Sequence, residues 1–396
     1  MPNTDTVFRP RTECGLAWLL HPHQPREFLE TIWGKSPFVV QRAERSFFEG
    51  IPNIATVDEL IATTAGGAAC RFIRYDTDGQ QSPSERHGSS TQSTMADVYD
   101  AYADGYTIVV NAVEERSARV ASICRALEAE TDQRTGANYY LTPPGAQGFP
   151  AHADTHDVIV AQIDGCKRWR VSASRPDNVQ PGELGTPDSL ASAFEWHLEP
   201  GDILYIPAGF VHEAFTVEDA SLHLTFGFSA VTLADLLLEA VQQLVERSGP
   251  LRTTVLQPGE LRTALPDSVV ATVTKLLRTL GTEQMDSARE HLASALLQRS
   301  TPVTGRLVDL DRARRLTPTT SLTHATWGPS TIRSAGPAAV LEFCGGVVEF
   351  DSERLPWLHF VADNEAFTLS DIPGPNDETK AEFIRELVRC GFLATG

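Results

Sequence analysis

The sequence has few cysteines, and none of them belongs to a Cys-x-x-Cys pair. The six cysteines are scattered, at positions 14, 70, 124, 166, 344 and 390. This spacing excludes a zinc knuckle and gives no sign of a disulfide framework. The sequence also lacks a run of about 20 apolar residues, which a membrane-spanning helix needs, and residues 1–10 lack the apolar core of a signal peptide. We therefore expect a cytoplasmic protein with no membrane partner.

Positive charge is also scarce. Lysine and arginine together number 33 against 52 for aspartate and glutamate, which gives a formal net charge of −19 at pH 7. An acidic surface repels phosphate backbones, so we do not expect nucleic acid as a partner. The same surface would attract a cationic partner, although an acidic surface that only keeps the protein soluble explains the charge equally well.

The chain is long enough for two or three domains, and its pattern changes along its length. From Asn138 to about Ser229, short strands alternate with turn signals such as Asp164-Gly165, which is typical of a sandwich or a barrel. After Val231 the apolar residues recur at helical spacing. We expect three domains, at residues 1–230, 231–305 and 306–396.

Apolar periodicity predicts individual elements within these domains. Helices are expected at Pro25 to Trp33, Arg116 to Thr131, Leu233 to Ser248, Pro266 to Leu280, Glu283 to Arg299 and Glu378 to Arg389, and strands at 107–111, Ala338 to Phe350 and Leu358 to Phe360. Segment 66–95 is rich in Gly, Ser, Thr and Gln, and is expected to be an exposed loop near the site. The three consecutive amphipathic helices carry no catalytic residue types and predict a homodimerisation unit.

The most informative motif is His152-Ala153-Asp154, which is followed later by His212. Side chains two residues apart on a strand point to the same face, so His152 and Asp154 are expected side by side. A histidine from a later strand would complete two imidazoles and one carboxylate on one face of a metal. That facial triad leaves coordination positions open and is the usual ligand set of non-haem Fe(II) oxygenases.

A lysine is expected in the same interior. Asp164-Gly165 is a strong two-residue turn signal, so Asp157 to Val171 is expected to be a hairpin in which Gln162 lies opposite Lys167. Opposed residues share a face, so Lys167 should project toward the metal ligands. An ammonium group inside a barrel is costly without an anion, and a dicarboxylate co-substrate would supply one.

Other polar side chains share the expected interior face. Asn138, Tyr140 and Thr142 alternate on the strand that precedes the metal motif, and Thr225 lies on a later strand. These groups are candidates to hydrogen-bond a bound acid, although Tyr140 also suits a half-buried strand aromatic. Two further histidines invite a ligand role: His223 fits a hydrogen-bonded core residue better, and His156 would replace a ligand only on an irregular strand.

Several stretches of this sequence are similar to the ribosomal oxygenases, a branch of the JmjC-type, cupin-fold 2-oxoglutarate oxygenases. The similar stretches are FLETIWGKSP at 28–37, NYYLTPPGAQG at 138–148, His152-Ala153-Asp154, GCKRWRV at 165–171, PAGFVH at 207–212 and SLHLTFGF at 221–228. The resemblance implies an α+β chain: a double-stranded β-helix (a cupin or jelly-roll barrel of JmjC type) with an N-terminal helical extension, then dimerisation helices, then a C-terminal winged-helix-like domain.

The resemblance also implies roles for single residues. His152, Asp154 and His212 would hold Fe(II), Lys167 would pair with the distal carboxylate of 2-oxoglutarate, and Asn138 and Tyr140 would line its pocket. Gly227 falls where some relatives carry a polar side chain, so that contact to the co-substrate is in doubt.

The activity that follows is a dioxygenase that uses Fe(II), 2-oxoglutarate and O2 to hydroxylate a side chain of a protein or peptide. Ribosomal proteins, hydroxylated at histidine or arginine, are the leading substrates by resemblance. A biosynthetic peptide, a small molecule or a modified nucleoside is the alternative. A non-catalytic binding protein of the same fold, and a cupin isomerase or metal-store protein, are disfavoured because neither needs both the triad and Lys167.

Overall fold

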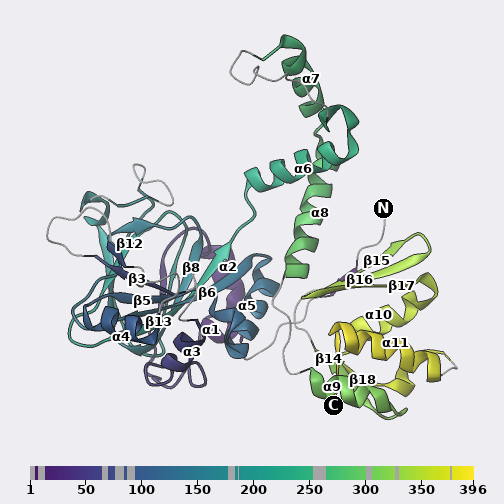
Figure 1. Ribbon diagram of the computed structural model, residues 1–396, viewed down its shortest axis with the longest axis horizontal. Coiled ribbons are helices and arrows are strands. Elements are labelled where there is room, and N and C mark those ends of the chain that lie inside the picture. Colours follow the sequence, from purple (N-terminus) through teal and green to yellow (C-terminus); the bar gives the residue numbers. More distant parts are fainter. Residues whose placement is uncertain are drawn as a thin grey trace.

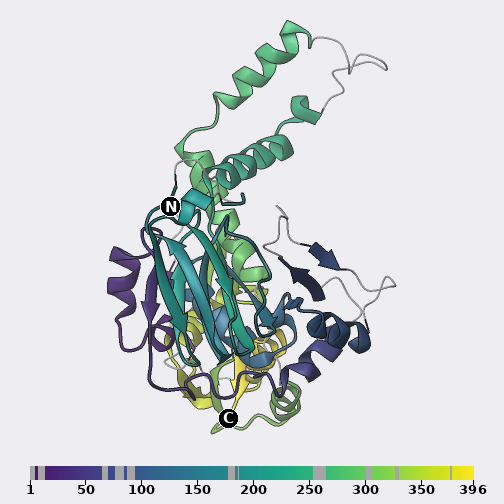
Figure 2. The same ribbon diagram turned by 90° about the vertical axis from the view of Figure 1, so that its left-hand side faces the viewer.

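The computed structural model describes residues 5–7, 14–64, 70–75, 84–86, 94–176, 183–185, 187–252, 265–299, 306–325, 330–374 and 377–396. Two antiparallel sheets form a barrel, with helices packed outside it, and a helical arm and a C-terminal unit follow along the chain (Figure 1). Seen after a quarter turn, the long strands of the barrel run side by side beneath the projecting arm (Figure 2).

The larger sheet has eight strands. Their spatial order is β2 (Phe38–Val40), β11 (Ile203–Ile206), β8 (Asp157–Gly165), β13 (Ser221–Ser229), β6 (Arg134–Thr142), β5 (Thr107–Val110), β3 (Cys70–Arg74) and β4 (Ser84–Arg86). The smaller sheet has the order β10 (Ala193–Leu198), β9 (Lys167–Ser172), β12 (Val211–Phe215) and β7 (His152–Ala153). This arrangement confirms the expected α+β class with a double-stranded β-helix.

Strand periodicity explains how the larger sheet is buried on both faces. Ile159 and Ala161 of β8 belong to the main core, which also contains residues of the N-terminal helices, whereas Val158 and Val160 pack between the two sheets. Successive side chains on a strand point to opposite faces, so each face of β8 meets a different layer. The helices of the outer layer are α1 (Leu16–Leu19), α2 (Pro25–Thr31), α3 (Val57–Thr64), α4 (Met95–Ala103) and α5 (Ala118–Thr131).

The expected hairpin over Asp157 to Val171 is wrong. β8 pairs with β11 and β13, whereas β9 pairs with β10 and β12, so the chain passes from one sheet to the other at this point. Gly165 makes this crossing possible. Its φ is +60°, and a Cβ at this position would collide with the carbonyl oxygen of Ala220. The Asp164-Gly165 signal is therefore a real bend that joins two sheets and not two neighbouring strands.

The expectation of a loop over residues 66–95 is wrong for part of that segment. β3 lies inside the larger sheet between β5 and β4, and its Phe72 and Ile73 are buried. The pairing with β5 provides the hydrogen bonds that turn this stretch into a strand. The remainder of the segment, apart from Tyr75, 84–86 and 94–95, falls outside the described residues.

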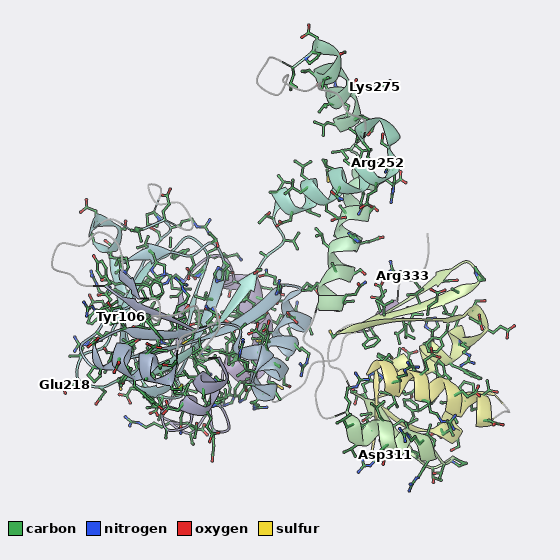
Figure 3. All side chains as sticks on the ribbon, in the orientation of Figure 1. Tyr106, Glu218, Arg252, Lys275, Asp311 and Arg333 are labelled. Carbon is green, nitrogen blue, oxygen red and sulfur yellow. The ribbon has the colours of Figure 1, made fainter. Side chains whose placement is uncertain are left out.

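The arm after the barrel consists of α6 (Leu233–Arg247), α7 (Asp267–Leu277) and α8 (Thr282–Arg299), as the periodicity predicts. α6 and α8 pack against each other, and α7 lies at the far end of the arm (Figure 1). Arg252 and Lys275 mark this arm in Figure 3, well away from the barrel. Several large apolar side chains of the arm remain exposed, namely Leu233, Leu237, Leu238, Val270, Val273 and Leu277.

The C-terminal unit begins with α9 (Leu307–Arg312) and has its own apolar core. Its strands are β14 (Ser321–His324), β15 (Ser330–Ala335), β16 (Ala338–Phe343), β17 (Gly346–Asp351), β18 (Ala366–Thr368) and β19 (Leu393–Thr395), and its longer helices are α10 (Leu355–Asp363) and α11 (Asp377–Cys390). The N-terminal strand β1 (Asp5–Val7) pairs with β15.

One element of the C-terminal unit differs from its expectation. Leu358 to Phe360 was expected to be a strand, but it lies in helix α10. Pro356 stands in the first turn, where a missing N–H costs no hydrogen bond. Leu358, Val361 and Ala362 are buried at helical spacing, which decides the conformation of this short apolar run. Among the described residues, no helix is long and apolar enough to cross a membrane.

Candidate active site

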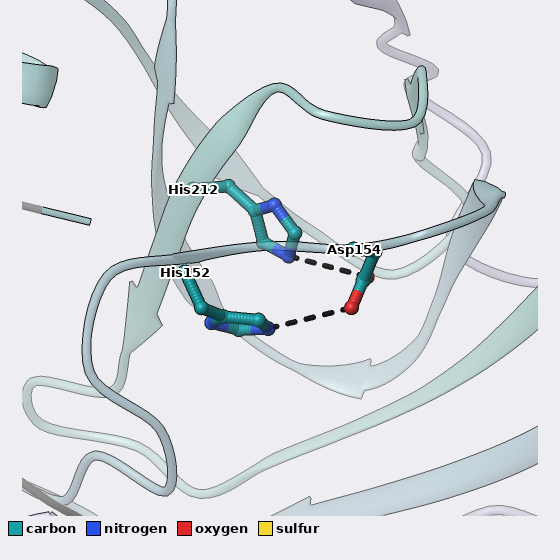
Figure 4. A group of neighbouring side chains, drawn as sticks. All are labelled: His152, Asp154 and His212. Atoms are coloured by element: carbon teal, nitrogen blue, oxygen red, sulfur yellow. Dashed lines mark ion pairs between the residues drawn. The ribbon is translucent and has the colours of Figure 1, made fainter. Parts of the chain in front are cut away.

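Two histidines and one aspartate converge on one point at the wall of the barrel (Figure 4). His152 and His212 are directly paired across β7 and β12, and Asp154 follows the end of β7. The Nε2 atom of His152 lies 3.7 Å from Asp154 Oδ1, and the Nε2 atom of His212 lies 3.6 Å from Asp154 Oδ2. One potential ligand atom from each residue lies within 4.8 Å of the others. This is the constellation that the H-x-D motif and His212 predict.

The outer nitrogens of both imidazoles are held by backbone. Nδ1 of His152 lies 2.8 Å from the carbonyl oxygen of Pro150, and Nδ1 of His212 lies 3.1 Å from that of Phe210. A carbonyl oxygen can only accept, so each Nδ1 carries the proton and each Nε2 presents a lone pair. Burial lowers the pKa of His212 to about 4, with the neighbouring His152 as a second cause. Both features suit a metal site, where ligating imidazoles are neutral and oriented from behind.

The donor set fits a divalent transition metal. Ligand atoms about 2.1 Å from an ion and at right angles to each other lie about 3 Å apart, and the N–O separations of 3.7 and 3.6 Å exceed this by less than about 1 Å. The His212 side chain is 6% exposed, whereas those of His152 and Asp154 are 26% and 31% exposed. The group is therefore anchored on one side and open on the other, as a site that binds further ligands requires.

A cavity of about 230 Å³ extends from this group into the barrel. Besides the three residues already described, its wall includes Arg71, Thr107, Tyr140, Phe149, Val158, Val160, Lys167, Trp169, His223 and Thr225. Three of these are not expected there from the sequence: Arg71, Thr107 and Phe149. Trp169 shares the inward face with Lys167, Val158 and Val160, as strand alternation predicts. Arg71 and Phe72 alternate on β3, and this alternation was the available signal, but it is hidden within a stretch rich in loop-forming residues.

Lys167 is the buried cation of this cavity. Its side chain is 4% exposed, and its Nζ donates a hydrogen bond to Thr142 Oγ1 at 2.8 Å. Burial lowers the pKa of Lys167 to about 7. Among the described residues no carboxylate forms an ion pair with it, so the charged form lacks the compensation that a buried ammonium requires. A ligand with a carboxylate would provide it.

Lys167 points inward for a reason other than the expected hairpin. It is the first residue of β9 and alternates with Trp169 and Val171, all of which are buried, whereas Arg168 is exposed. The smaller sheet faces the larger one across the barrel, so the inward positions of β9 meet those of β8. The expected direction of the side chain is correct, and the strand pairing used to reach it is wrong.

The structure brings Tyr140 and Thr225 to the cavity wall. Asn138 is not among the lining residues, but its side chain forms a hydrogen bond with Tyr140. Asn138 lies opposite Thr225 in the β6–β13 register, and its Oδ1 accepts a hydrogen bond from the backbone N–H of Ala112 at 3.1 Å. Ala112 has a left-handed φ of +54°, so Asn138 stabilises an uncommon turn. Burial raises the pKa of Tyr140 to about 12, so its hydroxyl remains a neutral donor and acceptor at neutral pH.

Two histidines near the site are not part of the His-Asp-His group. His223 lies on β13 opposite Tyr140, and its ring stacks on that of Tyr140 with centroids 4.8 Å apart. His156 lies against Gly227: a Cβ on Gly227 would come within 2.9 Å of two atoms of the imidazole. Gly227 thus leaves room for the ring of His156.

Comparison with known proteins identifies the barrel. A family model described as the JmjC domain matches residues 110–236. Ribosomal oxygenase 1 of Danio rerio is 31% identical over 252 residues, which are 60% of this chain and 45% of that protein. The bifunctional lysine-specific demethylase and histidyl-hydroxylase NO66 of Aedes aegypti is 30% identical over 225 residues, which are 53% of this chain and 34% of that protein. The chain spans less than half the length of these relatives.

Solved structures match nearly the whole chain. An X-ray structure of Escherichia coli ycfD is 23% identical and has a TM-score of 0.59, and the match covers 94% of this chain and 98% of that one. A structure of the ribosomal oxygenase YcfD in complex with cobalt and 2-oxoglutarate matches with the same coverage, 23% identity and a TM-score of 0.56. These matches confirm the expected fold. The resemblance to the ribosomal oxygenases rests on the curated relatives.

Proposed function

Since residues 110–236 match the JmjC domain model, we propose that the chain is an Fe(II)- and 2-oxoglutarate-dependent dioxygenase that hydroxylates a side chain of a protein or peptide. Ribosomal proteins are the first substrates to test, because the curated relatives include proteins named ribosomal oxygenase and histidyl-hydroxylase. The acidic chain, with a net charge of −19, would favour encounters with a cationic protein.

One observation carries the proposal: the His-Asp-His group and the buried Lys167 line the same cavity. A metal store or an isomerase needs the three ligands alone. A chelating acid with a second, distal carboxylate needs both the metal and a cation set back from it. 2-Oxoglutarate has this shape, and Lys167 lacks an acidic partner among the described residues.

The residues of the site have separate roles in the proposed reaction. When bound, Fe(II) together with 2-oxoglutarate and O2 supplies the oxidising chemistry that converts an unactivated C–H into C–OH, with release of succinate and CO2. His152, Asp154 and His212 would occupy three positions on one face of the metal, which leaves the others to ligands. Lys167 would orient the co-substrate, and Val158 and Val160 make the adjoining wall apolar and help exclude water.

The rest of the chain divides into further domains. One apolar core uses residues from Cys14 to Phe228 and another uses residues from Ala313 to Leu393, which supports the proposed divisions after residue 230 and before residue 306. The start of the proposed 1–230 domain differs, because β1 pairs with β15 of the 306–396 unit. Between them, at 231–305, leucines of α6 and valines of α7 leave apolar surface exposed. We propose that this surface forms a homodimer and that the last domain is winged-helix-like.

The test is oxygen-dependent turnover with a mapped product. The purified protein would be supplied with Fe(II) and 2-oxoglutarate in air or under nitrogen, with and without ribosomal proteins, and succinate would be quantified. We expect succinate only in air and a mass gain of one oxygen atom on a defined peptide, both absent from an Asp154→Ala variant.

Two outcomes would refine or overturn this proposal. Modification of a biosynthetic peptide, a free amino acid or a nucleoside, but of no ribosomal protein, would retain the oxygenase class and replace the substrate. An absence of oxygen-dependent succinate with every substrate would leave the non-catalytic binding protein as the better account.

A further inference from the structure

His223 is buried in the wall of the proposed co-substrate cavity, and its ring nitrogen Nδ1 has no hydrogen-bond partner among the described residues. His223 is 3% exposed and lies on β13 directly opposite Tyr140 of β6. The ring is held between two aromatics: it stacks on Tyr140 at 4.8 Å with an interplanar angle of 8°, and it meets Trp169 edge-on at 5.4 Å. The orientation of the imidazole is therefore set before any ligand arrives.

Two polar atoms of this wall have no hydrogen-bond partner among the described residues. Nδ1 of His223 and Nε1 of Trp169 are buried, and neither forms a hydrogen bond to any of the described residues. An unpaired buried donor or acceptor costs on the order of 1–3 kcal/mol, and such groups in native proteins call for an explanation. Both residues line the same cavity as Lys167, so a polar ligand in that cavity is the simplest explanation.

The charges around His223 indicate what kind of ligand this is. Burial, with the nearby Lys167 as a second cause, holds the pKa of His223 well below its ordinary value, so the ring is neutral and carries one N–H. His223 is not in the group of potential metal ligands formed by His152, Asp154 and His212. A neutral imidazole, an indole N–H and an ammonium can all donate to the same acceptor, and a carboxylate has two oxygens with room for several donors.

We propose that His223 is a positioning residue for the 2-oxoacid, whose distal carboxylate accepts a hydrogen bond from the His223 ring beside its ion pair with Lys167. This inference rests on the proposed function. It adds a second anchor to the distal end of the co-substrate, so the site would select a 2-oxo diacid over an acid that only chelates the metal. Stacking on Tyr140 keeps the ring in place, which reduces the entropy lost on binding.

The experiment compares two acids on the full chain loaded with Zn(II), which excludes turnover. 2-Oxoglutarate has both a chelating end and a distal carboxylate, whereas oxalate has a chelating end alone. Dissociation constants for both would be measured by titration calorimetry. We expect His223→Leu to weaken 2-oxoglutarate by about ten- to a hundredfold, the range for a hydrogen bond to a charged group, and to leave oxalate unchanged. His223→Asn, which keeps a side-chain N–H, should recover part of the loss.

Controls separate positioning from folding. Leu224→Val alters the next residue of β13, which is fully buried on the opposite face; it should lower the melting temperature and leave both dissociation constants unchanged. If His223→Leu does not fold, His223→Asn and the ¹⁵N resonances of labelled His223 in the wild-type protein remain as readouts. We expect those resonances to shift with 2-oxoglutarate and not with oxalate.

Equal weakening of both acids by His223→Leu, or no change in either, would overturn the positioning role. Failure of the wild-type protein itself to bind 2-oxoglutarate would instead overturn the proposed function.

Discussion

His152 and His212 face each other across adjacent antiparallel strands, with ring centroids 4.4 Å apart. The two residues are 60 positions apart in the sequence, and only the pairing of β7 with β12 brings them together. Because each ring is held from behind by a backbone carbonyl two residues earlier in the chain, the pair presents two lone pairs toward Asp154. Metal affinity should therefore depend mainly on His152, His212 and Asp154, and replacement of each should have its own measurable effect.

Removal of the only carboxylate of the triad should strongly weaken metal binding. We expect Asp154→Ala to weaken Fe(II) or Co(II) binding by more than about a hundredfold, because loss of an outer-shell partner alone costs about 10–100-fold. Metal content after dialysis and calorimetric titration would measure this. Glu213→Gln is the matched control: Glu213 adjoins His212 but pairs outward with Arg170 at 2.7 Å. Metal retention by Asp154→Ala would refute the assignment of the triad.

Lys167 should decide the affinity for the co-substrate. We expect Lys167→Ala to raise the dissociation constant of 2-oxoglutarate by about ten- to over a hundredfold, since a hydrogen bond to a charged group contributes about 1.5–3 kcal/mol. Lys167→Arg keeps the charge and should lose less. Binding to the Zn(II)-loaded protein by calorimetry checks both variants, and an unchanged constant in Lys167→Ala would place the distal carboxylate elsewhere.

The affinity for 2-oxoglutarate should fall as the pH rises above about 7. The pKa of Lys167 is about 7 in the free protein, and a bound carboxylate raises it, so binding above pH 7 takes up a proton. Linkage then weakens binding by up to about tenfold per pH unit in this range, whereas below pH 7 the lysine is already charged and the slope vanishes. Calorimetry in buffers of different ionisation enthalpy counts the proton. Lys167→Arg, which does not titrate here, should bind with no such slope.

The same lowered pKa has a consequence for folding in the absence of ligand. The unfolded chain binds the lysine proton up to a pKa of about 10.4, so between about pH 7 and pH 10.4 the unfolded state holds more protons than the folded state. The contribution of Lys167 to stability therefore rises with pH across this window. The free energy of unfolding can be measured with denaturant at pH 7 and pH 9.5. The increase with pH that Lys167 causes should be present in the wild-type protein and absent from Lys167→Met.

The apolar surface of the arm should hold two copies together. Leu237 and Leu238 on α6 are 44% and 68% exposed, more apolar area than a helix leaves to water without a partner. Lysines at both positions should convert a dimer to monomers, as measured by light scattering at micromolar concentration. Gln242→Lys adds charge to the same helix at an exposed polar position and should leave the dimer intact. A monomeric wild-type protein would contradict the expectation.

Even a methyl side chain at position 227 should lower the free energy of unfolding. In Gly227→Ala the new Cβ would lie 2.9 Å from two atoms at the far end of the half-buried His156 ring, so the ring must shift, at a cost on the order of 1 kcal/mol. The free energy of unfolding, obtained from denaturant titration, should fall accordingly. His156→Ala removes the obstructing ring, and the double variant should recover most of the loss. A destabilisation that is additive in the double variant would show that His156 is not its cause.

Much of the site could be predicted from the sequence because strand alternation is local. His152 and Asp154 share a side by virtue of their spacing, and the same period of two places Tyr140 and Thr225 on inward faces whatever strands lie beside them. The helices after Val231 were likewise predictable, because apolar residues recur at spacings of three and four within each segment. None of these inferences needs to know which elements are neighbours.

What the tertiary structure decided is the pairing of elements that are distant in the sequence. The bend at Gly165 is visible in the sequence, but whether it joins neighbouring strands or two opposed sheets depends on β11 and β13 competing for the edges of β8. β3 becomes a strand because β5 offers it hydrogen bonds, and Leu358 becomes helical because a separate core buries that side of the run. Backbone hydrogen bonds and burial are contributed by distant partners, so a segment with weak local preference takes the structure that its neighbours complete.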